Sequence, residues 1–212
     1  MSNNKVSKSA LRERLLQVRR GLTADDRAAA ERAVAQHALD LTELSDARTV
    51  AAYVSMGGEP GTRALLDVLR ERGERVLLPV LLPDNDLDWA LYEGPEGLVR
   101  TARGLYEPTG PRLGPAAVTR ADAVLLPGLA VDGRGLRLGR GGGSYDRVLA
   151  RLDAAGASPA LVVLLYAHEV LERVPAEPHD RPVDAVVTPE GVRRFGKRRG
   201  GGPEGPPPLG RR

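Results

Sequence analysis

Residues 125–147 constrain the fold of this chain more than any other segment, because they join an apolar run, a glycine-rich loop and a helix pattern. Ala123–Leu126 predicts a buried strand, and Ser144–Ala154 carries apolar residues at helical spacing. Glycines, Arg137 and Arg140 occupy the loop between them. This order is typical of phosphate binding, because glycines let several N–H groups converge on one anion and a helix N-terminus adds partial positive charge.

The loop does not match two well-known phosphate-binding motifs. A Walker A loop carries Lys-Ser or Lys-Thr after its last glycine, whereas Gly143 is followed here by Ser144 and Tyr145. The dinucleotide fingerprint fails as well, because the residue three positions after Gly141 is Ser144 and not glycine or alanine. On loop composition alone, a flexible surface loop is therefore an equally good interpretation.

The predicted helix after this loop carries a carboxylate in its first turn. Asp146 is badly placed to contact phosphate directly, because like charges repel. It is well placed to hold a hard cation that bridges phosphate oxygens, and Mg²⁺ is the cation expected there.

The chain alternates between strand and helix patterns after two N-terminal helices. Thr23, with Asp26 three residues later, predicts an acidic variant of the capping box at the start of the second helix. We predict an α/β fold with one domain over residues 1–195, a mainly parallel sheet, helices on both faces and a ligand site beyond the carboxyl ends of the strands. Helices are predicted over 6–19, 24–41, 60–72, 144–154 and 169–173, and strands over 49–54, 75–80, 88–92, 121–126, 160–165 and 184–187.

The C-terminal segment differs from the rest in composition. Residues 193–212 hold seven of the 31 basic side chains and one of the 28 acidic ones, so the remainder of the chain is slightly acidic. We predict residues 196–212 to be a disordered Gly/Pro/Arg-rich tail that contacts polyanions weakly. Because aromatic residues make up only 3% of the chain, no stacking platform and no specific nucleic-acid binding are expected.

Composition excludes several other kinds of site. The chain has no cysteine, so it has no disulfide, no thiolate nucleophile and no cysteine-based zinc site. Its three histidines, His37, His168 and His179, are too scattered to predict a zinc site. The polar segment Met1–Ala10 lacks the apolar core of a secretory signal, and no apolar run has the length of a membrane span, so we expect a cytoplasmic protein. We also expect a monomer.

The run LGRGGGSYDR at residues 138–147, preceded by PGLA at 127–130 and by Asp132, resembles the signature of the 5-formyltetrahydrofolate cyclo-ligase family, also called methenyltetrahydrofolate synthetases. Further pieces occur in the family's order, so the resemblance extends over about residues 5–190. These pieces are Lys8-Ser9-Ala10-Leu11-Arg12, Tyr53-Val54-Ser55 with Glu59 and Thr62, Glu107-Pro108, Pro175, His179-Asp180, Asp184 and Thr188.

The resemblance implies an enzyme that uses ATP and Mg²⁺ to convert 5-formyltetrahydrofolate, with or without a polyglutamate chain, to 5,10-methenyltetrahydrofolate. In the family mechanism the formyl oxygen attacks the γ-phosphate, N10 then attacks the activated carbon, and phosphate leaves. No protein nucleophile is needed, because the protein positions the substrates and neutralises charge. Two alternatives stay open at this point: a non-catalytic relative that binds folate or nucleotide, and an RNA-associated role of the basic tail.

The resemblance also implies an ATP site. Lys8 and Arg12 share one helix face, which usually means a solvated surface, but in the family such residues close over the nucleotide. Arg12 is then expected to grip phosphate through two N–H groups. The ATP-binding residues implied are Lys8, Ser9, Ala10, Leu11, Arg12, Arg137, Leu138, Gly139, Arg140, Gly141, Gly142, Gly143, Ser144 and Tyr145, with Arg140 and Tyr145 as catalytic residues.

Folate and metal positions follow from the same resemblance. Glu59, which is otherwise explained as a carboxylate favoured near a helix N-terminus, is implied to face the folate together with Val54. Asp146 and Asp180 are implied to bind Mg²⁺, although a loop aspartate between prolines is ordinarily a turn former. Thr62 is expected to be structural. The remaining folate contacts implied are Arg140, Gly141, Gly142, Gly143 and Ser144.

One position departs from the family pattern. Most members have two consecutive aromatic residues before the aspartate, whereas this chain has Ser144-Tyr145. Ser144 is expected to cap the helix but cannot stack on a ring, so affinity or substrate choice is expected to differ. This departure is also the feature that favours the non-catalytic alternative.

Overall fold

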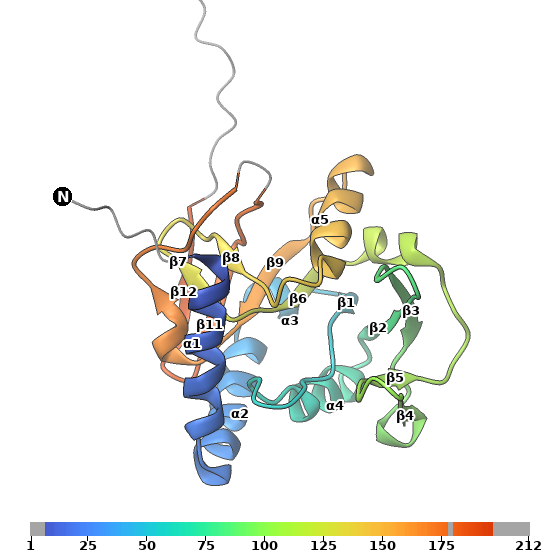
Figure 1. The fold of residues 1–212 in the computed structure, drawn as a ribbon. Helices are drawn as coiled ribbons and strands as arrows, with labels where there is room; N and C mark the ends of the chain where they lie inside the picture. Colours follow the sequence, from blue (N-terminus) through green and yellow to red (C-terminus); the bar gives the residue numbers. More distant parts are fainter. Residues whose placement is uncertain (1–6, 178–179, 197–212) are drawn as a thin grey trace, which may run out of the picture.

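The computed structural model describes residues 7–177 and 180–196 (Figure 1). His179 and almost all of the predicted tail lie outside the described residues. A seven-stranded sheet has the order β12-β11-β9-β6-β1-β2-β3. Its five central strands are parallel, and only β3 and β12 run antiparallel, at the two edges, so the predicted mainly parallel sheet is confirmed. The strands are β1 (Thr49–Ala51), β2 (Arg75–Leu81), β3 (Leu87–Leu91), β6 (Ala123–Pro127), β9 (Ala160–Leu164), β11 (Ala185–Thr188) and β12 (Gly191–Arg194).

Helices cover both faces of this sheet, as the alternating pattern predicts (Figure 1). Successive strand residues point to opposite faces, so each of the five central strands contributes to two separate apolar clusters. One cluster joins α2 (Ala24–Leu39) and α4 (Arg63–Glu71) to strand residues such as Val50 and Leu125. The other joins α5 (Ser144–Ala154) to the alternate residues, such as Ala51 and Val124.

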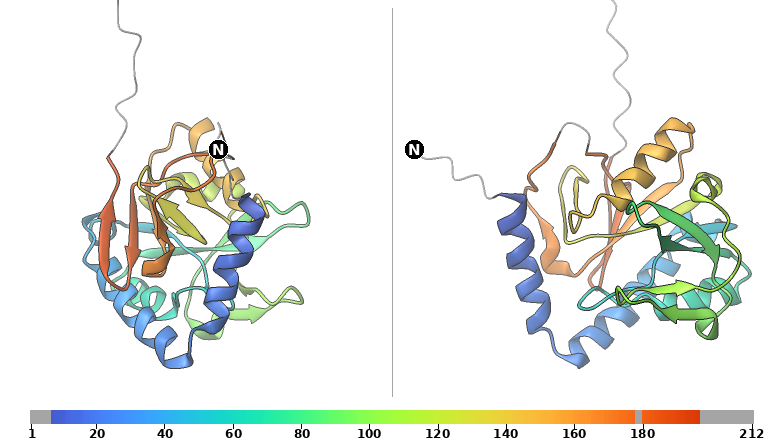
Figure 2. Two further views of the ribbon diagram at one scale, coloured as in Figure 1. Left: turned by 60° about the vertical axis from the view of Figure 1, so that its left-hand side comes forward. Right: turned by 45° about the vertical axis from the view of Figure 1, so that its right-hand side comes forward.

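Helix α1 (Lys8–Gly21) lies along the outside of the molecule, against a small second sheet (Figure 2). That sheet consists of β7 (Ala130–Asp132), β8 (Arg137–Leu138) and β10 (Val170–Leu171). Leu11 and Leu15 of α1 pack on it, and the buried Arg19 guanidinium binds both carboxylate oxygens of Glu169, at 2.6 and 2.9 Å. These contacts hold the N-terminal turn of α1 beside residues 139–143, which connect β8 to α5 and are called the glycine loop below.

Several local predictions are wrong. The strand predicted over 49–54 ends at Ala51, and the helix predicted over 60–72 begins at Arg63. Residues 169–173 are not a helix, because the Glu169 side chain is drawn inward by Arg19, a short 3₁₀ turn (Ala167–Glu169) ends there and Val170 begins β10. The strand at 184–187 is not the last, because β12 follows it. The second predicted helix ends at Leu39, two residues early, and a short α3 (Thr42–Ser45) follows. The capping box of Thr23 and Asp26 is confirmed.

Residues 94–119, for which the sequence predicts no element, contain a small hairpin and two 3₁₀ turns. The hairpin pairs β4 (Leu98–Arg100) with β5 (Tyr106–Pro108), and the turns cover Pro95–Gly97 and Pro115–Arg120. In Figure 1 the hairpin lies to the right of the glycine loop and α1 lies to its left. Within residues 7–177 and 180–196, no helix has the length and apolar character needed to span a bilayer.

Candidate active site

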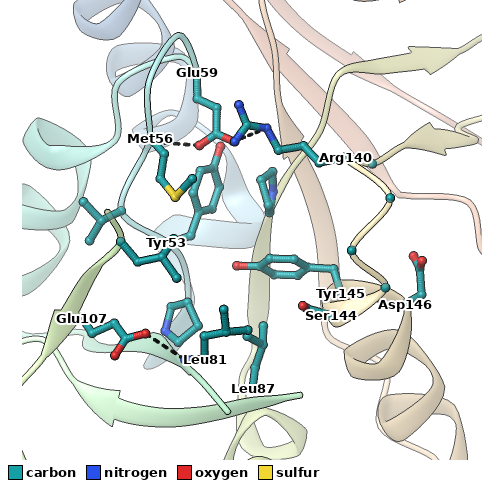
Figure 3. Close-up of a pocket in the computed structure, with 18 of the residues that line it drawn as sticks. Tyr53, Met56, Glu59, Leu81, Leu87, Glu107, Arg140, Ser144, Tyr145 and Asp146 are labelled. Atoms are coloured by element: carbon teal, nitrogen blue, oxygen red, sulfur yellow. Dashed lines mark hydrogen bonds and ion pairs between the residues drawn. The ribbon is translucent and has the colours of Figure 1, made fainter. Parts of the chain in front are cut away.

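The cavity that we call the main pocket lies where the strand order of the sheet changes direction, on either side of β1. From β1 the chain passes to β2 on one side, whereas β6 adds on the other side of β1. In open α/β sheets such a switch point leaves a crevice beyond the carboxyl ends of the two strands. A pocket of about 230 Å³ occupies this crevice and is lined by residues that follow β1, by the glycine loop after β6 and by the β4–β5 hairpin (Figure 3).

One wall of this pocket is apolar. Leu81 and Leu87 come from the ends of β2 and β3, and Leu105 and Tyr106 come from the hairpin. The opposite wall is the bare backbone of the glycine loop. A flat apolar wall facing exposed peptide groups suits a ring system that carries polar edges.

The glycine loop has a shape that glycine allows most easily. Gly141 and Gly143 have φ angles of 95° and 76°, in the left-handed region. Gly143 occupies the N-cap position of α5, and no side chain caps this helix. Ser144 is therefore the first helical residue, and the prediction that it caps the helix is wrong, because the left-handed glycine already holds that position.

The two arginines predicted in the loop have different environments, and only Arg140 lies in it, because Arg137 belongs to β8. Arg137 has a side chain only 6% exposed, and it donates to the Pro127 carbonyl at 3.0 Å and to the Asp146 carboxylate at 3.1 Å. Burial lowers the pKa of Arg137, and the nearby Asp146, Tyr145 and Asp180 oppose this shift. Arg140 is 41% exposed, and its Nε lies 3.6 Å from Glu59 Oε1, beyond hydrogen-bond distance. Arg140 is therefore the less constrained cation.

Glu59 belongs to the pocket and not to a helix N-terminus, because α4 begins four residues later, at Arg63. Its Oε2 accepts the Met56 N–H at 2.8 Å. Burial raises the pKa of the Glu59 carboxyl, while the Met56 N–H and the Arg140 guanidinium act in the opposite direction. Val54 lines the same pocket, so the structure brings together the two residues implied to face the folate.

Two phenol rings also reach the pocket. Figure 3 shows Tyr145 pointing from the start of α5 toward the middle of the cavity, while Asp146 turns away from it. Tyr53 lies on the side of Glu59. Neither hydroxyl has a hydrogen-bond partner among the described residues, and burial raises the pKa of both phenols, so both stay protonated and able to donate.

A second cavity adjoins the first, with Arg137 and Asp146 lining both. Asp146 and Asp180, the two residues implied to bind metal, both line it. Residues 7–177 and 180–196 contain no cluster of three or more His, Asp or Glu side chains able to hold a metal ion. A cation here would therefore need further ligands from a bound substrate.

The N-terminal helix contributes two of its predicted residues to this region. Lys8 Nζ lies 3.1 Å from Asp180 Oδ2, and Arg12 Nε donates to the Gly139 carbonyl at 2.9 Å. Ser9 and Ala10 are exposed and line neither cavity. Leu11 and Leu138 are buried in the apolar cluster beneath α1, so their side chains do not face a ligand.

Several pocket residues carry no role in the sequence-based assignment. Most are apolar or aromatic residues near strand ends, which look like ordinary core residues in a sequence. Glu107 is the exception, because it is charged, and its carboxylate accepts the Leu81 N–H at 3.0 Å. Tyr53, Glu107 and Pro127 belong to segments that carry the resemblance, which implies no role for them. Thr62 is structural, as expected, since its hydroxyl donates to the Tyr53 carbonyl. The missed lining residues are Tyr53, Met56, Pro79, Leu81, Leu87, Leu105, Tyr106, Glu107 and Pro127.

Comparisons with known proteins agree on one family. The model of the 5-formyltetrahydrofolate cyclo-ligase family matches residues 4–189. A protein named 5-formyltetrahydrofolate cyclo-ligase from Mycolicibacterium smegmatis is 43% identical over 189 residues, which cover 87% of this chain and 94% of that protein. The protein of the same name from Escherichia coli K12 is 34% identical over 180 residues, covering 83% and 97%.

Solved structures share the fold. The NMR structure of Aquifex aeolicus 5,10-methenyltetrahydrofolate synthetase superposes with a TM-score of 0.75 at 30% identity, covering 89% of this chain and 92% of that one. The structure of a 5,10-methenyltetrahydrofolate synthetase from Mycoplasma pneumoniae gives a TM-score of 0.70 at 21% identity, covering 87% and 100%. At that lower identity the likeness concerns the fold alone.

Proposed function

Because this chain belongs to the 5-formyltetrahydrofolate cyclo-ligase family, we propose that its main pocket binds the folate ring and that the second cavity binds the phosphates of ATP. The chain is an enzyme, a cyclo-ligase that converts 5-formyltetrahydrofolate to 5,10-methenyltetrahydrofolate. ATP becomes ADP and phosphate in this reaction. We propose that the chain keeps this catalytic role although it has Ser144 where most members of the family have an aromatic residue.

The observation that carries the proposal is the contact between two unlike cavities. Charged side chains make up five of the seven residues that line the second cavity, but only five of the 20 that line the main pocket. A reaction between a folate and a triphosphate needs such a pair of neighbouring sites, because the formyl oxygen and the γ-phosphorus must meet. Arg137 and Asp146 lie where the two sites adjoin, because they line both.

The chemistry places two demands on the protein. When the formyl oxygen bonds to the γ-phosphorus and ADP leaves, negative charge on the phosphate must be neutralised. Arg140, 41% exposed and without a short hydrogen bond, is free to turn toward that charge. N10 then attacks the formyl carbon, and phosphate leaves with the original formyl oxygen. Tyr145, whose hydroxyl is buried and stays protonated, supplies a hydrogen-bond donor near the reacting groups.

We propose that Asp146 and Asp180 hold Mg²⁺. The donor set fits, because Mg²⁺ prefers one or two carboxylates together with substrate phosphates, and these two carboxylates line one cavity. Bound there, the ion supplies charge neutralisation to the phosphates. Lys8 and Arg12 approach the same region from α1 and add positive charge to it.

We also propose that the enzyme works as a monomer in the cytoplasm, on folates with or without additional glutamates. Light scattering after size-exclusion chromatography tests the first point. The KM values of the monoglutamate and polyglutamate substrates test the last.

Absorbance of the methenyl product tests the proposed function. The purified protein is mixed with 5-formyltetrahydrofolate, ATP and Mg²⁺, and each component is omitted in turn. We expect product only when all three are present. A folded protein that binds folate and forms no product would contradict the proposal and favour the non-catalytic alternative, with Ser144→Tyr as the next variant.

A further inference from the structure

One buried hydroxyl in the main pocket carries no role in the assignments above. The Tyr53 side chain is 4% exposed, and its hydroxyl has no hydrogen-bond partner among the described residues. Burying a hydroxyl without a partner destabilises a folded protein, so such groups call for an explanation. Because Tyr53 lines the pocket, a ligand can supply the missing hydrogen bond.

The backbone around Tyr53 holds the ring in place. β1 ends at Ala51, and the Ala52 N–H still donates to the Leu77 carbonyl of the neighbouring strand. The Tyr53 carbonyl accepts the Thr62 hydroxyl at 2.8 Å. Tyr53 therefore sits at the carboxyl end of a central strand with little freedom to move, and Figure 3 shows its ring directed toward the Glu59 carboxyl.

Tyr53 and Glu59 together form a donor beside an acceptor. Burial and the nearby Glu59 carboxyl raise the pKa of the Tyr53 phenol, so the hydroxyl stays protonated at neutral pH and can donate. Glu59 Oε2 accepts the Met56 N–H, while Oε1 lies 3.6 Å from the Arg140 Nε and keeps capacity to accept. The 2-amino-4-oxo ring edge of a folate presents the reverse pattern, a carbonyl acceptor beside N–H donors.

We propose that the Tyr53 hydroxyl is a substrate-binding group that donates to the ring carbonyl of the folate while Glu59 accepts from the adjacent N–H groups. This inference rests on the proposed function, because it takes a folate as the ligand. It places Tyr53 in folate binding and not in phosphoryl transfer, since Tyr53 does not line the cavity assigned to ATP. The hydroxyl then contributes to KM for the folate and leaves kcat unchanged.

Tyr53→Phe removes this hydroxyl and keeps the ring. We expect the KM for 5-formyltetrahydrofolate to rise about tenfold, the loss of roughly one good hydrogen bond. The KM for ATP and kcat should stay within about twofold of wild type. The melting temperature without substrates should not fall, because the variant no longer buries an unsatisfied hydroxyl.

Tyr166→Phe is the matched control. The Tyr166 side chain is also 4% exposed, and its hydroxyl likewise has no partner among the described residues, but it lines neither cavity. We expect both KM values of this variant to be those of wild type. A wild-type KM for folate in Tyr53→Phe would overturn the inference, as would a rise accompanied by a lower melting temperature, which would mark the hydroxyl as structural. Wild-type enzyme that forms no methenyl product would instead contradict the proposed function.

Discussion

The two adjoining cavities differ in whether their polar groups have partners within the protein. In the main pocket, the hydroxyls of Tyr53 and Tyr145 are buried and have no partner among the described residues. In the second cavity, charges are already paired: Arg137 with Asp146, and Arg181 with Asp153 at 2.6 Å. The main pocket therefore offers neutral hydroxyl groups that can still form hydrogen bonds, whereas the charged groups of the second cavity already form ion pairs.

This difference matches the ligands proposed for the two regions. A neutral ring gains most from donors and acceptors that need not first give up another partner. A triphosphate with its cation can instead exchange partners with existing ion pairs, so the unliganded protein avoids leaving several charges unpaired. The two cavities are thus suited to ligands of different kinds. Arg140 is an exception to the contrast, because it is a charged group of the main pocket and its ion pair with Glu59 is long.

The largest effect is expected from Arg140→Ala, which removes the charged group of the main pocket whose ion pair is long. If this arginine neutralises charge during phosphoryl transfer, kcat/KM should fall by about 100-fold or more. The fold should survive, because the side chain is 41% exposed and makes no short hydrogen bond to the part of the chain that the structure describes. Steady-state kinetics and a thermal melt measure the two outcomes.

Arg147→Ala is the control for this variant. Arg147 lies on α5, is 50% exposed and pairs with Asp84, but it lines neither cavity. We expect its kinetics to stay close to those of wild type. Near-normal activity in Arg140→Ala would mean that all of the catalytic charge resides in the second cavity, and would contradict the role proposed for this arginine.

A smaller effect is expected when a carboxylate of the second cavity is neutralised. In Asp146→Asn, the Mg²⁺ concentration that gives half-maximal rate should rise about tenfold, equal to about 1.4 kcal/mol. Asp153→Asn is a close control, because Asp146 and Asp153 line the same cavity and are 63% and 62% exposed. Equal changes in both variants would show that the cavity attracts the cation by its general charge and not through Asp146.

Much of this fold can be predicted because its patterns are local. The β6 strand, the glycine loop and α5 follow one another in sequence, and the alternation of strand and helix implies a parallel sheet. The helix predicted over 169–173 fails because Glu169 pairs with Arg19, 150 residues away. No local pattern reports such a contact. The hairpin at 98–108 is missed for a related reason, since the glycines and prolines of residues 94–119 favour several turn structures equally.

The residues of the site also fall into two groups, those that the sequence identifies and those that only the fold reveals. Lys8, Arg12 and the glycine loop are found through the family resemblance, and the structure brings them together. Tyr53, Leu81 and Leu87 are missed, because at the ends of buried strands they look the same as core residues. Tyr53 becomes visible as a pocket residue only once β1 is seen to end at Ala51, three residues before the predicted end of the strand.

The smallest effect concerns the stability of the main pocket. Burial raises the pKa of the Glu59 carboxyl, so the folded protein binds this proton more tightly than the unfolded chain does. Stability is therefore lost as pH rises from the ordinary carboxyl range through the raised pKa. Glu59→Gln removes that loss, and we expect a gain of about 1 kcal/mol, or roughly 2–4 °C in melting temperature, at pH 7. Near pH 3, more than one unit below the ordinary Glu pKa of about 4.3, the wild-type carboxyl is protonated in both states, and the gain should disappear.

The same substitution should weaken folate binding, because the amide no longer offers a carboxylate beside Tyr53. Glu107→Gln is the control: Glu107 lines the pocket too but is less buried, so removal of its charge should not stabilise the protein at pH 7. A lower melting temperature of Glu59→Gln at pH 7 would show that the ion pair with Arg140 outweighs the burial of the carboxylate. The main pocket would then hold its charges in stabilising pairs, as the second cavity does, and the contrast between the two regions would be lost.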